Sequence, residues 1–473
     1  MRQHPPKEKA AKRGDTLRQK DRGGMRRARR VLTFWKPERT MQNIAVIGAG
    51  ITGVTTAYEL AARGFAVTVY DRNRYAAMET SFANGGQLSA SNAEVWNYPA
   101  TIAKGLTWLM KPDAPLSLSL KPGWHKYSWL AQFLGNIPNY RANTTRTAEL
   151  AVAARQRMRD IAAREGIAFD RDDRGILHFY ATEAQMAHAR RVSELLAAGG
   201  VERVELDAEG IRRLEPRLKG DFIGGFHTPG DATGDIHLFT TGLARASARL
   251  GVTYRMETEI LSCRHDGTDT HIRYRDAEGQ VRHAIHPAIV VCAGIGSRAI
   301  ARGLGDRVNI YPVKGYSITV NLEDDISVQA APELSLLDDA AKIVTSRLGR
   351  ARFRVAGTAE FAGENRDIRA CRIRPLVEWV NRHFPAVSTR QCVPWAGLRP
   401  MTPSMMPKVG PGRRAGVFYN TGHGHLGWTL SAATADLVAQ SVEAQLRRPG
   451  AVMPLTAENM PPARAALVGA SDR

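Results

Sequence analysis

The chain of 473 residues lacks several features that would assign it to a class at once. It has only four cysteines (Cys263, Cys292, Cys371 and Cys392) and none forms a CxxC pair, so neither a structural zinc site nor a disulfide framework is expected. No histidine cluster has metal-ligand spacing, and no internal repeat is visible. No stretch approaches the ~18–20 apolar residues that span a bilayer. These absences favour a metal-free globular protein in a reduced, cytoplasmic setting.

Positive charge is in excess, but it is unevenly distributed. The formal net charge is +20, and residues 1–40 alone carry 14 Lys or Arg and 4 Asp or Glu, a net +10. This basic arm has no apolar periodicity, so we expect it to be disordered. Three interpretations compete: a tail that contacts nucleic acid or an anionic membrane, a targeting peptide, or an upstream extension of a protein that starts at Met41. We favour the last, and expect no nucleic-acid partner, because the pattern of a fold begins within three residues of Met41.

Residues 43–72 have the pattern of one β-α-β unit. The apolar segment from Asn43 to Ile47 predicts a strand, GAGITG predicts a tight turn, and Thr52 to Arg63 predicts a helix. A second strand is predicted from Ala66 to Tyr70. Farther along, apolar spacing predicts four more helices, at residues 147–166, 183–198, 240–250 and 372–384.

The motif G-x-G-x-x-G/A occurs three times, and only its context distinguishes the matches. The first, at Gly48, Gly50 and Gly53, follows a strand and opens a helix, and Asp71 ends the next strand. In such a unit the glycines permit a tight turn, approach of a pyrophosphate and close helix–strand packing, while the acid accepts hydrogen bonds from a ribose. The helix N-terminus offers unpaired N–H groups to the diphosphate. This match therefore predicts a dinucleotide site.

The second match, at Gly294, Gly296 and Ala299, has no later strand that ends in an acid. We interpret it as a strand that returns to the nucleotide sheet, with Gly294 close to the dinucleotide. An independent NAD site is the alternative.

The third match, at Gly422, Gly424 and Gly427, leads directly into a long helix. A helix N-terminus stabilises negative charge that develops nearby, and a reduced flavin carries such charge. We therefore assign residues 424–429 to a flavin ring, with a capped helix that binds no ligand as the alternative.

Five further motifs occur together in a fixed order: TSFANGGQLS at 80–89, GDIHLFT at 234–240, YPVKGYS at 311–317, GLRPMTP at 397–403 and TGHGHLGWT at 421–429. This set resembles the bacterial D-amino-acid dehydrogenase family, within the group of D-amino-acid oxidase, glycine oxidase and sarcosine oxidase flavoproteins. The resemblance extends from Met41 to about Arg447 and has no counterpart for residues 1–40.

The resemblance implies an α/β fold in which a Rossmann-like FAD-binding domain is interleaved with an α+β substrate domain built on a mixed sheet. We expect FAD-binding segments at residues 41–125, 231–305 and 395–447. Substrate-domain segments are expected at 126–230 and 306–394, with the arm at 1–40 and a loose tail at 448–473.

The fingerprints and the resemblance together predict the residues that contact FAD. They are Ile47, Gly48, Ala49, Gly50, Thr52, Gly53, Asp71, Arg72, Ser81, Asn84, Gly85, Gln87, Ile260, Gly294, Gly424, Leu426, Gly427 and Thr429.

For the substrate, the resemblance implies that Arg399, in GLRP, grips a carboxylate, because a guanidinium fork matches a carboxylate with two charge-assisted hydrogen bonds. Tyr316 is predicted as a second carboxylate or pocket contact, with a packed core tyrosine as the alternative. Lys314 is placed either near the flavin or on the surface. His423 and His425 are candidates for a general base, but they lie in a glycine loop whose backbone, and not its side chains, is expected to contact the flavin.

The activity implied is oxidative deamination of a D-amino acid to a 2-oxo acid and ammonia, with hydride transfer to flavin N5 and electrons passed to a quinone or other carrier. In the family that this chain resembles, some members attach FAD covalently through a cysteine near the GLRP segment. Residues 397–403 contain no cysteine and Cys392 lies seven residues before Arg399, so the resemblance implies non-covalent FAD here. A secondary amino acid of the D-hydroxyproline, proline or sarcosine type is the alternative substrate. An NAD-dependent dehydrogenase and a nucleic-acid-binding protein are the alternatives from other classes. We expect a cytoplasmic protein, or one held peripherally on the inner membrane, and no metal.

Overall fold

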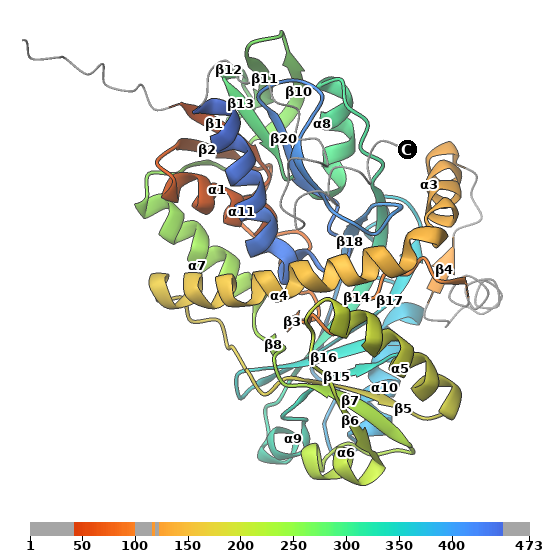
Figure 1. The fold of residues 1–473 in the computed structure, drawn as a ribbon. Coiled ribbons are helices and arrows are strands. Elements are labelled where there is room, and N and C mark those ends of the chain that lie inside the picture. Colours follow the sequence, from red (N-terminus) through yellow and green to blue (C-terminus); the bar gives the residue numbers. More distant parts are fainter. Residues whose placement is uncertain (1–41, 100–115, 119–122, 448–473) are drawn as a thin grey trace, which may run out of the picture. The chain divides into compact units, whose positions relative to one another are not determined.

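The computed structural model describes residues 42–99, 116–118 and 123–447. The predicted arm at 1–40 and tail at 448–473 lie outside the described residues. The described elements form two large sheets and their covering helices (Figure 1).

The first large sheet has six strands and carries the glycine fingerprints. Its order is β19-β20-β13-β1-β2-β9, and every neighbouring pair is parallel except β19 with β20. The strands are β1 (Asn43–Ile47), β2 (Ala66–Tyr70), β9 (Thr253–Arg255), β13 (Ala288–Val291), β19 (Lys408–Pro411) and β20 (Val417–Thr421). Strand β13, which precedes the second fingerprint, does return to this sheet, between β1 and β20. The predicted Rossmann-like architecture is confirmed.

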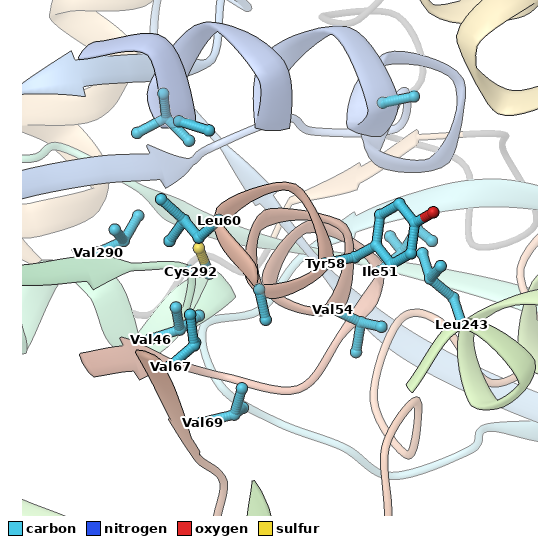
Figure 2. Close-up of a cluster of buried hydrophobic side chains, with 14 of the residues drawn as sticks. Val46, Ile51, Val54, Tyr58, Leu60, Val67, Val69, Leu243, Val290 and Cys292 are labelled. Atoms are coloured by element: carbon cyan, nitrogen blue, oxygen red, sulfur yellow. The ribbon is translucent and has the colours of Figure 1, made fainter. Parts of the chain in front are cut away.

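Both faces of this sheet are covered, which explains why its strands read as continuous apolar runs. Ile44 and Val46 of β1 face a core shared with α1 (Ile51–Ala62), α7 (Ile236–Arg249) and α11 (Gly427–Leu446). Figure 2 shows Val46 and neighbouring valines of the sheet packed beside α1. Ala45 and Ile47 face the opposite side, which is covered by three antiparallel strands and a helix. These are β10 (Glu259–His265), β11 (Thr270–Arg275), β12 (Val281–His286) and α8 (Ser297–Gly303).

The second large sheet is mixed, as predicted, and has nine strands in the order β18-β14-β17-β16-β15-β5-β7-β6, with β4 paired to β17. They are β4 (Leu116–Leu118), β5 (Ile176–Tyr180), β6 (Val204–Asp207), β7 (Gly224–Thr228), β14 (Tyr311–Asn321), β15 (Ser335–Asp338), β16 (Ile343–Leu348), β17 (Arg352–Phe361) and β18 (Cys392–Met401). One face packs on α6 (Ala208–Leu214) and α10 (Ala370–His383) through a core that includes Phe353 and Trp379.

The remaining elements connect and cover these sheets. They are α3 (Trp124–Gly135), α4 (Tyr140–Glu165), α5 (Glu183–Ala198), α9 (Asp325–Ala330), the 3-10 turns η1 (Ile137–Asn139) and η2 (Gly294–Gly296), and the paired short strands β3 (Gln87–Leu88) and β8 (Ala232–Thr233). Helix α5 has the predicted bounds, and its N-cap Thr182 forms a capping box with Gln185. Helix α4 begins earlier than predicted, and its N-cap Asn139 makes no side-chain cap that would mark the start.

Successive segments of the chain alternate between the two large sheets. Strands β4 and β18 pair within the nine-stranded sheet, although the predicted FAD-binding segments 41–125 and 395–447 include β4 and most of β18. Their pairing partners β17 and β14 lie far away in sequence, so the local sequence pattern could not indicate which sheet β4 and β18 join. The domain boundaries stay a prediction.

Candidate active site

A cavity of about 540 Å³ lies where the two large sheets meet. It is lined by the residues that follow β1, β2 and β13, by the loops at 79–87 and 421–429, and by parts of β14, β17 and β18. Its volume is in the range of ligand and cofactor pockets, ~300–1,000 Å³. Of the predicted site residues, all line it except Ala49 and Gly53. Segments distant in sequence are thus assembled into one site.

The three glycines of the first fingerprint have different surroundings. Gly48 has φ +107°, and a Cβ there would lie 2.6 Å from the carbonyl oxygen of Cys292. A Cβ on Gly53 would lie 1.8 Å from the carbonyl oxygen of Gly48, so this pair lets α1 pack directly on the turn. A Cβ on Gly50, in contrast, would meet only Ser81 Oγ, at 3.5 Å. Gly48 and Gly53 therefore serve packing, and Gly50 keeps the cavity wall open.

Asp71 joins the ends of β1 and β2. Its Oδ2 accepts a hydrogen bond from the Ala49 N–H at 2.7 Å, and its Oδ1 accepts from the backbone and side-chain amides of Asn73 at 2.8 and 2.9 Å. A carboxylate has about four acceptor positions, so Asp71 retains capacity toward the cavity. Next to it, Arg72 forms an ion pair with Glu79 at 2.6 Å.

The loop at 80–89 is fastened to both sheets. Ser81 Oγ accepts from the Ile51 N–H at 3.0 Å, at the start of α1, where the N-cap Gly50 has no side chain. Gln87 Nε2 donates to Ser335 Oγ at 2.8 Å, on β15. A Cβ on Gly85 would lie 2.5 Å from a methyl carbon of Val344.

Asn84 and Gly294 are two further predicted residues near this loop: the first closes a turn and the second leaves space beside the backbone. Asn84 Oδ1 accepts from the Gly86 N–H at 2.9 Å and so closes the turn of the 80–89 loop. A Cβ on Gly294 would meet nothing within 4 Å, and this glycine has φ +54°.

The third fingerprint places the N-terminus of α11 at the cavity. Gly424 has φ +57°, and its N–H donates to the carbonyl of Pro400 at 3.0 Å. Leu426 precedes the first residue of the helix, Gly427, and Thr429 Oγ1 accepts from the Ser89 N–H at 3.2 Å. The N-termini of α1 and α11 therefore both line one cavity, where their dipoles favour negative charge.

Arg399 is a cation in the cavity wall with no ion-pair partner in the described part of the chain. Its Nη1 donates to the carbonyl of Thr358 at 3.1 Å. Burial lowers the pKa of Arg399 to about 10, so it remains protonated at neutral pH. Burying a charge without a partner is unfavourable, which makes Arg399 a strong site for an anion.

Tyr316, which lines the cavity, and Lys314 lie in a buried polar network around Glu360. The Tyr316 hydroxyl donates to Glu360 Oε2 at 2.5 Å, which favours the packed-core alternative. Lys314 is fully buried, does not line the cavity and pairs with Glu360 at 3.3 Å. The surface position for Lys314 is wrong, and its place near the flavin stays a prediction. Arg369 also contacts Glu360.

The histidines of the 421–429 loop are neutral at physiological pH. Burial lowers the pKa of His423 to about 3, and its Nε2 contacts Thr434 Oγ1 at 3.0 Å. Burial, with the charge of Arg399, lowers the pKa of His425 to about 4. His425 stacks on Trp96 with ring centroids 5.1 Å apart. Such weak bases are poor proton acceptors.

The cavity wall also contains residues that the sequence did not indicate. Trp395 and Thr358 lie beside Arg399, and Asp339 and Lys342 form an ion pair at 3.0 Å. Trp395 precedes GLRP and could have been found by its alternation with Arg399 along a strand. The other three give no local signal.

Residues 42–99, 116–118 and 123–447 contain no helix that is both long and apolar enough to cross a membrane. The same residues hold no group of three or more His, Cys, Asp or Glu side chains arranged for a metal ion.

Comparison with known proteins gives consistent matches. A family model described as DAO, FAD dependent oxidoreductase, matches residues 43–441. "D-amino acid dehydrogenase 3" of Mesorhizobium japonicum is 54% identical over 413 residues, which cover 86% of this chain and 98% of that protein. "D-amino acid dehydrogenase" of Paramagnetospirillum magneticum is 40% identical over 420 residues, covering 86% and 96%.

Among solved structures, glycine oxidase from Bacillus cereus superposes with a TM-score of 0.65 at 20% identity, covering 85% of this chain and 95% of that one. L-proline dehydrogenase from P. horikoshii gives 0.66 at 16% identity, covering 86% and 95%. At these identities the solved structures establish the fold alone.

Proposed function

The chain belongs to the DAO family of FAD-dependent oxidoreductases, and on that premise we propose that it oxidises a D-amino acid to the corresponding 2-oxo acid and ammonia. The observation that carries this proposal is Arg399, a cation without an ion-pair partner among the described residues, in the same cavity as the dinucleotide fingerprint. Relatives named D-amino acid dehydrogenase, aligned over nearly their whole length, support the substrate class.

The residues of the cavity fit FAD. The turn at Gly48 to Gly50 and the N-terminus of α1 would hold the diphosphate, because N–H groups at a helix start bind phosphate. Asp71 would accept hydrogen bonds from the ribose. The loops at 80–89 and 421–429 would contact the ring system, with the N-terminus of α11 favouring the negative charge of the reduced state.

We propose that FAD is held without a covalent bond. Cys292 lines the cavity, but burial raises the pKa of its thiol to about 12, so the reactive thiolate does not form. Cys392 does not line the cavity.

The chemistry that bound FAD would supply is acceptance of the hydride from the substrate's α-carbon. The chain contributes chiefly position. Arg399 binds the carboxylate through its guanidinium fork and fixes the direction of the α-carbon. We assign neither His423 nor His425 as a proton acceptor, because the pKa of each lies far below neutral.

We further propose that electrons pass to a quinone or another carrier, and that the protein contacts the inner membrane peripherally when it does so. The relatives are named dehydrogenases, which supports an acceptor other than dioxygen.

A turnover screen of the purified holoprotein tests the proposal. D-amino acids, L-amino acids, proline, D-hydroxyproline and sarcosine are each supplied with an artificial dye acceptor, and separately with dioxygen alone. We expect dye reduction with D-amino acids and equal yields of 2-oxo acid and ammonia. Turnover confined to proline, D-hydroxyproline or sarcosine would show that the substrate is a secondary amine and not a primary one. Rapid turnover with dioxygen alone would show that the protein is an oxidase.

A further inference from the structure

Arg399 lies on a part of the nine-stranded sheet where two glycines face each other. Strands β14 and β18 pair so that Val313 is opposite Arg399 and Gly315 is opposite Gly397. Directly opposed residues of an antiparallel pair project to the same face. Gly315 and Gly397 therefore leave a bare strip of backbone on the face that carries the Arg399 side chain.

The Arg399 guanidinium occupies this strip. A Cβ on Gly315 would lie 2.4 Å from Cζ, 2.4 Å from Nη2 and 2.8 Å from Nε of Arg399. Since three guanidinium atoms are this close to one point, the group lies flat over the Gly315 backbone. Trp395 covers the other glycine, because a Cβ on Gly397 would lie 2.2 Å from its indole.

A β-bulge fixes the remaining end of the guanidinium. Lys314 pairs with Glu360 and Tyr316 with Gly357, so β17 has one more residue than β14 over this interval. Bulges re-aim residues beside active sites. Within this one, Thr358 has φ +56°, a conformation that β-branched residues rarely adopt. Its carbonyl is turned to accept the hydrogen bond from Arg399 Nη1 at 3.1 Å.

Thr358 is unfavourable for stability in a second way. Its Oγ1 is buried and has no hydrogen-bond partner in the described structure. Two costs at one residue, in the wall of a cavity, indicate a functional constraint. The Thr358 carbonyl accepts from Nη1 of Arg399. Among the described residues, neither Nε nor Nη2 of Arg399 has a hydrogen-bond acceptor. That edge is the fork that matches a carboxylate.

We propose that Gly315 and the Thr358 bulge are positioning elements that hold Arg399 flat, with its Nε–Nη2 edge presented to the substrate carboxylate. This inference rests on the proposed function, in which Arg399 binds that carboxylate. Gly315 is then a determinant of substrate affinity although it has no side chain and does not carry charge.

The test is Gly315→Ala, measured with the D-amino acid turned over fastest in the screen above. The clashing group is the end of a flexible side chain, so the protein should fold, with an unchanged thermal midpoint and flavin spectrum. The guanidinium must move by about 1 Å, and a displacement of that size can lower the catalytic rate ~100-fold. We expect KM to rise at least ~10-fold while kcat falls less than ~3-fold. Gly135→Ala is the matched control, because a Cβ at that position, in α3, meets nothing within 4 Å.

A double-mutant cycle separates this inference from the proposed function. In an Arg399→Lys background, Gly315→Ala should change KM by less than ~2-fold, because the planar group that it displaces is absent. A wild-type KM in Gly315→Ala beside an impaired Arg399→Lys would refute the positioning role and leave the carboxylate role intact. An equal loss in both backgrounds would also refute it. Wild-type kinetics in Arg399→Lys would refute the binding of the carboxylate by the guanidinium fork, on which this inference rests.

Discussion

Replacing Arg399 by Met should separate substrate binding from stability, because the same residue supports one and opposes the other. Met has a similar length and no charge, so the cavity wall stays filled. Two charge-assisted hydrogen bonds to a carboxylate, at about 1.5–3 kcal/mol each, would be lost. We expect kcat/KM to fall by about 10²–10⁴-fold, since each 1.4 kcal/mol is a factor of ten.

The stability of the unliganded protein should change in the other direction or not at all. Burial lowers the pKa of Arg399 to about 10, which corresponds to about 3 kcal/mol against the charged guanidinium. The lost hydrogen bond to the Thr358 carbonyl offsets about 1.5–3 kcal/mol of this. We therefore expect a free energy of unfolding between unchanged and ~1.5 kcal/mol higher.

The assay is steady-state kinetics with a dye acceptor, together with urea unfolding and a flavin spectrum. Arg413→Met is the control, since Arg413 is exposed and does not line the cavity. A kcat/KM within ~3-fold of wild type would refute the carboxylate role. A large loss of stability would refute the view of Arg399 as a half-buried cation that has no ion-pair partner among the described residues.

Three further outcomes follow from the cofactor half of the cavity. Asp71→Asn should weaken FAD binding by about 10–100-fold in a fluorescence titration, because an amide cannot accept all the bonds that this carboxylate accepts; unchanged affinity would contradict its role. Gly53→Ala should abolish folding or FAD uptake, because its Cβ would lie 1.8 Å from the Gly48 carbonyl oxygen. Gly50→Ala, in contrast, should fold normally and bind FAD weakly. Equal thermal midpoints for the two variants would contradict this difference. His423 is neutral when folded and takes up a proton when unfolded below pH ~6.5, so this residue should contribute about 1.4 kcal/mol per pH unit to the loss of stability as the pH drops toward 4. His423→Gln should reduce the slope of acid-unfolding curves by that amount, and an unchanged slope would count against the low pKa.

The parts of the fold that the sequence predicted are those where local pattern and global fold agree. The Gly48 fingerprint, with a strand before it and Asp71 after it, determines a turn, a helix start and a pairing within 30 residues. The continuous apolar run of β13 likewise marks a strand buried on both faces. Its return to the six-stranded sheet followed from that pattern alone.

What could not be predicted depends on register between distant segments. Tyr316 lies on β14 and lines the cavity, but its hydroxyl donates to Glu360 on the neighbouring strand β17, which the sequence did not indicate. Thr358 adopts its left-handed conformation because of a bulge against β14, and no residue type in this segment indicates a bulge. Gly315 matters only because β18 places Arg399 over it. Cross-strand neighbours of this kind are fixed by packing, which single-sequence periodicity does not contain.

The central claim is that one cavity holds FAD and a D-amino acid together, and anaerobic mixing tests it most directly. The purified holoprotein, without any external acceptor, is mixed with single D- and L-enantiomers, and the oxidised flavin band near ~450 nm is followed. We predict that the D-enantiomer bleaches this band at a rate that saturates with concentration, and that the L-enantiomer does not. A colourless protein, or a band that both enantiomers bleach equally or that neither affects, would contradict the account.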